Sequence, residues 1–237
     1  MLGGIQVYDI RDRFPYVNGR EYRERSLSSI TGVVMHHTAT GGADTIDSAQ
    51  ALLSAIHRWH TGITPGSPND WPAIGYHFAI DSSGRIYWLN GIELVSYHCG
   101  GIPVVNGIGK GNWDNIGVAW LGNFTNKEPT PVMVSSADAL LTALETHLNK
   151  DLNLLGHKEV PGNSTICPGN HWPTTKSRMG GGPSTDIRPL WEAIFLSPVY
   201  KAYIASGSLP GLTPEDEEDI HEIFKKMVSI KSRHGWN

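Results

Sequence analysis

Hydrophobic positions follow strand-like or helix-like spacing along most of the chain after residue 30. The β-branched stretch from residue 30 to residue 35 is typical of a buried strand, and it ends at the pair His36-His37. Residues 44–60 then carry apolar side chains at helical intervals, which predicts an amphipathic helix of about four turns. A strand followed directly by a helix is the first sign of a layered α/β fold.

Two alternating stretches in the middle of the chain predict a β-hairpin. Residues 74–80 and 85–89 flank the polar turn Asp81-Ser-Ser-Gly84, whose glycine suits a tight reversal. Residues 116–122 are largely apolar and predict a further strand.

The later part of the chain alternates helices with one short strand. Residues 135–149 predict a second helix with Ser135 or Ser136 as its N-cap, and residues 152–156 predict a strand that leads to His157. Residues 170–184 are rich in Gly, Pro and Ser and predict a loop. Further helices are expected over residues 186–204 and 213–228.

These elements predict an α/β fold with a central mixed β-sheet flanked by helices. We expect three parts: an N-terminal segment, 1–29, packed on the domain; the main domain, 30–205; and a C-terminal helical tail, 206–237. The chain is long enough to bury a full core, since it has 237 residues of which 39% are hydrophobic.

Composition and charge narrow the functional classes. No apolar run approaches the roughly 20 residues that span a bilayer, so we expect no membrane insertion. The start of the chain lacks a charged and then apolar leader, which favours synthesis in the cytoplasm without a signal peptide. The net charge of -4 and the scattered basic residues give no reason to expect nucleic-acid binding. The two cysteines are expected to be reduced thiols.

His157 and Cys167 flank a short loop that contains Pro and Gly, and together they can ligate a borderline-soft metal such as zinc. His36, at the end of a predicted buried strand, is the natural third ligand. The competing candidates are His37, His77 and His98. Because neighbouring strand residues point to opposite faces, His36 and His37 are not expected to bind the same ion.

Several motifs around these residues resemble one family. They are Val-Met-His36-His37-Thr-Ala-Thr, Gly75-Tyr-His-Phe, Asn115-Ile-Gly-Val, Gly156-His-Lys-Glu-Val and Thr165-Ile-Cys-Pro-Gly. In this order, over about residues 30–195, they are similar to the zinc N-acetylmuramoyl-L-alanine amidases of type 2, which include phage endolysins and peptidoglycan recognition proteins. The resemblance implies the fold of those proteins and a Zn²⁺ ion held by His36, His157 and Cys167.

The resemblance also implies catalytic roles for Tyr76 and Thr165, as hydrogen-bond donors to the water or to the developing oxyanion. Some phage relatives have Lys where this chain has Thr165, and some members have Glu on the strand where this chain has Ala119 or Leu121. No general base is therefore assigned. Either the zinc-activated water needs none, or Glu159 serves, although a surface position pointing away from the metal fits Glu159 better.

His98, Asn112 and Trp113 are expected to bind substrate, because polar loop groups near a site often contact ligand. A hydrogen-bonded structural histidine is the alternative for His98. The expected function is hydrolysis of the amide between N-acetylmuramic acid and L-alanine of peptidoglycan, by a monomeric phage or prophage endolysin that lyses the cell wall. The alternatives are a non-catalytic peptidoglycan-binding module, a structural zinc site, and a cytoplasmic amidase that recycles muropeptides.

Overall fold

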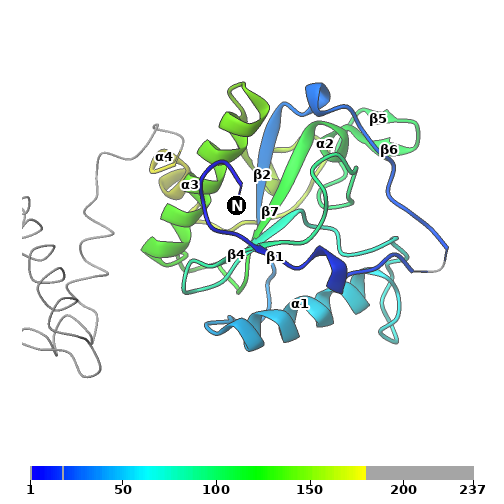
Figure 1. Cartoon of the computed structure of the whole chain (residues 1–237), viewed down its shortest axis with the longest axis horizontal. Helices are drawn as coiled ribbons and strands as arrows, with labels where there is room; N and C mark the ends of the chain where they lie inside the picture. The colour runs from blue at the N-terminus through cyan, green and yellow to red at the C-terminus, as the bar shows by residue number, and fades with distance from the viewer. Residues whose placement is uncertain (1, 18, 180–237) are drawn as a thin grey trace, which may run out of the picture. The chain divides into compact units, whose positions relative to one another are not determined.

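A six-stranded mixed β-sheet forms the centre of the protein in a computed structural model that describes residues 2–17 and 19–179 (Figure 1). The strand order is β1-β4-β3-β7-β2-β8. Only the pair β3–β4 is antiparallel, and the other neighbouring pairs are parallel. The bounds are β1 Tyr8–Asp9, β2 Gly32–His37, β3 Phe78–Ile80, β4 Ile86–Trp88, β7 Asn115–Trp120 and β8 Asn153–Gly156. The predicted fold class and the predicted hairpin are confirmed.

Two long helices cover opposite faces of this sheet. Helix α1, Ile46–His60, begins at the capping box of Thr45 and Ser48. Its Leu53 packs on the face of the sheet that carries Ala79 and Tyr87. Helix α3, Pro131–Leu148, packs on the other face, as Figure 1 shows. The apolar side chains of β2 and β7 that meet α3 alternate along each strand: Val33, Met35, Ile116, Val118 and Trp120.

Helix α3 begins earlier than predicted. Its N-cap is Thr130, whose hydroxyl accepts a hydrogen bond from the backbone N–H of Met133, and Pro131 occupies the first turn. The predicted caps, Ser135 and Ser136, therefore lie inside the helix. A Thr-Pro pair is itself a good start signal, because the proline has no N–H that needs a partner there.

Several short elements were not predicted. The N-terminal segment joins the sheet through β1, while β5 (Val104–Val105) and β6 (Ile108–Gly109) form a separate two-stranded sheet. Helix α2, Lys110–Asp114, follows β6 directly. Helix α4, Trp172–Ser177, lies in the stretch predicted as a loop. That prediction was wrong because buried Trp172 and a proline in the first turn stabilise a short helix despite the surrounding glycines.

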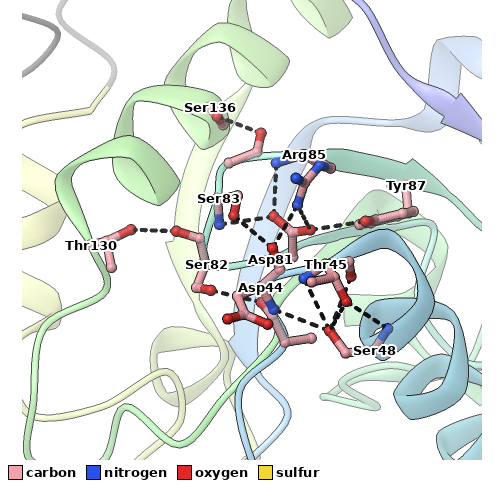
Figure 2. A network of polar contacts seen from close by, with 12 residues as sticks. Asp44, Thr45, Ser48, Asp81, Ser82, Ser83, Arg85, Tyr87, Thr130 and Ser136 are labelled. Carbon is pink, nitrogen blue, oxygen red and sulfur yellow. Dashed lines mark hydrogen bonds and ion pairs between the residues drawn. The ribbon is translucent and has the colours of Figure 1, made fainter. Parts of the chain in front are cut away.

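The turn between β3 and β4 joins three parts of the fold (Figure 2). Asp81 is fully buried and accepts hydrogen bonds from the backbone N–H groups of Ser83 and Arg85, and from the side chains of Arg85 and Tyr87. The next residues reach the start of α1, where Ser83 and Arg85 donate to the carbonyl of Asp44. Thr130 donates to the carbonyl of Ser82, so α3 is tied to the same turn.

The helices predicted over 186–204 and 213–228 lie outside the described residues, and so does the predicted domain boundary at residue 205. Within residues 2–17 and 19–179, no helix is both long enough and apolar enough to cross a bilayer.

Candidate metal centre

Two histidines meet at the carboxyl ends of neighbouring parallel strands. In the pairing of β2 with β8, Met35 lies opposite Gly156, so the next residues, His36 and His157, lie side by side. Their ring centroids are 4.6 Å apart. His36 points to the face of β2 opposite Met35, because side chains alternate along a strand. The local sequence therefore brings both imidazoles to one edge of the sheet.

Cys167 completes a three-residue cluster. The loop that carries it is tied back beside β8 by a hydrogen bond from the Lys158 N–H to the carbonyl of Cys167. Its Sγ lies 3.9 Å from Nδ1 of His36 and accepts a hydrogen bond from the backbone N–H of His37. The candidate ligand atoms of His36, His157 and Cys167 all lie within 4.8 Å of one another, close enough to share one ion.

The chemistry of these donors suits zinc. Two imidazoles and one thiolate are typical protein ligands of Zn²⁺, and a three-ligand set leaves the fourth tetrahedral position open. Burial lowers the pKa of His36 and of His157, so both rings are neutral at pH 7 and each keeps a lone pair. Burial raises the pKa of the Cys167 thiol to about 11, so binding a divalent cation has to displace its proton.

Tyr76 and Thr165 lie beside the cluster. The Tyr76 ring is 5.4 Å from the His36 ring, and burial raises the pKa of Tyr76, so its hydroxyl stays protonated and can donate. The Thr165 hydroxyl accepts a hydrogen bond from the backbone N–H of Cys167, which leaves its own proton free to be donated elsewhere. Both side chains are half-buried and neutral at pH 7.

Two open cavities border the cluster. One, of about 510 Å³, reaches it through His157 and is also lined by Trp71, Tyr97, His98, Asn112 and Asn163. The other, of about 350 Å³, reaches it through Tyr76 and is also lined by Thr38, Thr40, Trp59 and His60. Both cavities offer room for a ligand next to the candidate metal position.

A family model described as N-acetylmuramoyl-L-alanine amidase matches residues 26–170, more than half of the chain and all of the cluster. The chain belongs to this family. Peptidoglycan-recognition protein SC1a of Drosophila melanogaster is 29% identical over 140 residues, which are 58% of this chain and 67% of that protein. N-acetylmuramoyl-L-alanine amidase of Mus musculus is 28% identical over 141 residues, which are 57% of this chain and 24% of the mouse protein.

Solved structures of recognition proteins share the fold of this amidase-family chain. One is the complex of tracheal cytotoxin with the ectodomains of peptidoglycan recognition proteins LCa and LCx. The similarity has a TM-score of 0.58 at 24% identity and covers 70% of this chain and 91% of that one. Drosophila peptidoglycan recognition protein SA is 28% identical with a TM-score of 0.51, covering 65% of this chain and 79% of that one. The family includes amidases and recognition proteins, so membership alone does not assign catalysis.

The three predicted substrate residues occupy different positions in this amidase-family fold. His98 and Asn112 are buried and line the cavity of about 510 Å³ beside His157. Trp113 does not line this cavity, and its indole N–H donates to the carbonyl of Val105. The Asn112 side-chain oxygen accepts from the backbone N–H groups of residues 98–100. Both ring nitrogens of His98 have hydrogen-bond partners, and burial lowers its pKa to about 3. These contacts hold His98 and Asn112 in the wall of that cavity, and the substrate-binding roles of the three residues stay predictions.

The remaining candidates lie outside the cluster. His37 accepts a hydrogen bond from the backbone N–H of Phe124, and His77 contacts Ser96 and the N–H of Gly117. Glu159 accepts from the Gly156 N–H, the Trp172 indole and Lys176, so its carboxylate faces α4. Burial alone would raise the pKa of Glu159, but these hydrogen bonds outweigh it and lower that pKa.

Sequence reasoning missed His60 and Asn163, which line the two cavities. His60 ends α1, where its Nδ1 accepts from the backbone N–H of Gly75, and its ring lies 5.5 Å from that of Tyr76. A histidine at a helix end carries no signal of this kind by itself. Asn163 follows the Pro-Gly pair of the loop between His157 and Cys167, and its position within that loop was the only available signal.

Proposed function

We propose that this protein is a zinc-dependent amidase that cleaves the amide bond between the lactyl group of N-acetylmuramic acid and L-alanine in peptidoglycan. The observation that carries the proposal is the convergence of His36, His157 and Cys167, with ligand atoms within 4.8 Å, beside two open cavities. Family membership supports the same substrate class. A ligand set with one open position is typical of catalytic rather than structural zinc.

When bound, zinc would polarise the scissile carbonyl and lower the pKa of a coordinated water. The protein's own side chains would then position the substrate and stabilise the negative charge that develops on the carbonyl oxygen. We assign Tyr76 the role of a neutral donor to the oxygen that gains negative charge, because its ring lies against His36 and its hydroxyl stays protonated. Thr165 is the second donor, held beside Cys167 by its backbone contact.

Replacing Tyr76 with phenylalanine is expected to lower kcat by roughly 10²-fold, the usual cost of one oxyanion donor, with little change in zinc affinity. Tyr22→Phe is the matched control, because Tyr22 is buried and its hydroxyl lies against the carbonyls of Ala73 and Ile74, which are not cluster residues. Steady-state kinetics on a soluble muramyl peptide measure the effect. An equal kcat in Tyr76→Phe and wild type would contradict the role of Tyr76 as a donor to the oxygen that gains negative charge.

The test of the function uses purified cell walls and two chemical readouts. Amidase activity should release new N-terminal L-alanine and reduce the turbidity of the walls without producing new reducing sugar. Activity should disappear after treatment with a chelator and return with Zn²⁺. Reducing sugar without free L-alanine would indicate a glycosidase instead, and binding to walls without any product would indicate a recognition module.

We also propose that polymeric wall is the preferred substrate, as expected for a bacteriolytic enzyme of the endolysin type. The two cavities are open, which suits a substrate that continues beyond the site. Rates on intact walls and on soluble muropeptides separate this role from muropeptide recycling. A preference for small anhydro-muropeptides would favour recycling.

A further inference from the structure

A buried chain of hydrogen bonds leads from Arg25 to the candidate metal ligand His36. Arg25 is 6% exposed, and its guanidinium donates to the carbonyls of Asn112, Trp113 and Asn115 at 2.8–2.9 Å. The carbonyl of Asn115 also lies 3.2 Å from Nε2 of His98. The other ring nitrogen, Nδ1 of His98, lies 3.1 Å from Nε2 of His36.

The Asn115 carbonyl determines which ring nitrogens of His98 and His36 carry hydrogens in this series of hydrogen bonds. A carbonyl oxygen only accepts, so Nε2 of His98 carries the hydrogen. In a neutral imidazole the other nitrogen is then an acceptor, and Nδ1 of His98 must receive a hydrogen from Nε2 of His36. His36 is thereby fixed with a free lone pair on Nδ1, the nitrogen that lies 3.9 Å from Cys167 Sγ.

The second ligand, His157, is fixed in the same way by Asn163. The amide nitrogen of Asn163 donates to the carbonyl of Val160 at 3.2 Å, which identifies the other amide atom as the oxygen. That oxygen lies 3.1 Å from Nε2 of His157 and can only accept. With its hydrogen on Nε2, directed at Asn163, His157 leaves Nδ1 free for the metal. The backbone carbonyl of Cys99 is a second acceptor near this ring.

The His98 ring is held in place from two further sides. A Cβ on Gly117 would lie 2.5 Å from Cγ of His98, so the ring packs directly on the glycine of the Asn115-Ile-Gly-Val motif. The backbone N–H of His98 donates to the side chain of Asn112. A ring held this closely has little freedom to turn and exchange its two nitrogens.

We propose that His98 and Asn163 are positioning residues that hold His36 and His157 in the tautomer with Nδ1 as the metal-binding atom. Metal-ligating histidines commonly donate their second N–H to a carboxylate or a carbonyl, and such partners affect metal affinity by about 10–100-fold. Here a second histidine and an amide take that place, so neither partner adds negative charge to the site. The proposal rests on the metal site of the proposed function, not on the reaction.

The test measures zinc affinity of the full chain by competition with a chromophoric chelator. His98→Leu and Asn163→Ala each remove an acceptor and should weaken zinc binding by about 10–100-fold. His98→Asn keeps an acceptor near the position of Nδ1 and should recover most of the affinity. His57→Asn is the matched control, because His57 is a buried histidine that contacts Pro15 and Phe14 and no cluster residue.

Thermal unfolding in the presence of chelator reports whether each variant folds. If His98→Leu does not fold, the zinc affinity of Asn163→Ala tests the proposal, because Asn163 is half-exposed and its replacement should be tolerated. Long-range ¹H–¹⁵N spectra of the metal-free wild type should show protonated Nε2 and bare Nδ1 on His36 and His157. Wild-type affinity in both His98→Leu and Asn163→Ala, or a protonated Nδ1 on His36 or His157, would overturn the proposal. Failure of the wild type to bind zinc at all would instead contradict the proposed function.

Discussion

Cys167→Ala is expected to lower amidase activity by at least about 10³-fold, because losing the metal forfeits several kcal/mol of transition-state stabilisation. The remaining pair, His36 and His157, offers two ligands, too few for the usual three-residue catalytic set. Zinc affinity should fall together with activity. The measurements are release of N-terminal L-alanine from purified walls and metal content after gel filtration.

Cys99 provides the matched control for this experiment. It is also a free, buried cysteine, and burial raises its pKa to about 12, but it packs against Val34 and Val160 and is absent from the ligand cluster. Cys99→Ala should therefore keep its zinc and most of its activity. Retained activity in Cys167→Ala, or equal loss in both variants, would contradict the assignment of Cys167 as a ligand.

The main elements, and the residues that form the cluster of His36, His157 and Cys167, could be predicted from the sequence because each depends on local pattern. The strand that ends at His36 has a continuous apolar run, and the hairpin has a clear polar turn. The observed start of α3 differs from the predicted one although Thr130-Pro131 is a good N-terminal pair, because Ser135 and Ser136 are also good N-cap residue types. The two-residue strand β1 has no comparable signal, because its parallel pairing with β4 depends on distant residues.

The contacts that surround the ligands could not be predicted in the same way. The loop position of His98 allows either substrate binding or a hydrogen-bonded structural role, and the sequence does not indicate that its nitrogens meet His36 and the carbonyl of Asn115. Those partners are 62 and 17 residues away in the chain. Their meeting depends on the order of β7 and β2 in the sheet, which the hydrophobic pattern does not specify. A motif can therefore predict a candidate ligand without predicting which groups will contact it.

Asp81→Ala is expected to lower the free energy of unfolding by about 3–4 kcal/mol, more than any surface substitution, because one buried carboxylate accepts four hydrogen bonds. Its loss would leave the hydroxyl of Tyr87 and two turn N–H groups without their acceptor. The same turn holds the starts of α1 and α3 (Figure 2), so the change would loosen both helix layers at once.

Thermal unfolding in chelator should show this loss as a decrease in Tm of about 10 °C. Asp70→Ala is the matched control, since Asp70 also pairs with an arginine, Arg20, but on the exposed surface, where such pairs contribute little. Its Tm should stay close to that of the wild type. Because Asp81 contacts no member of the metal cluster, folded Asp81→Ala protein should bind zinc as tightly as the wild type. A wild-type Tm in Asp81→Ala would show that the turn does not support the two layers.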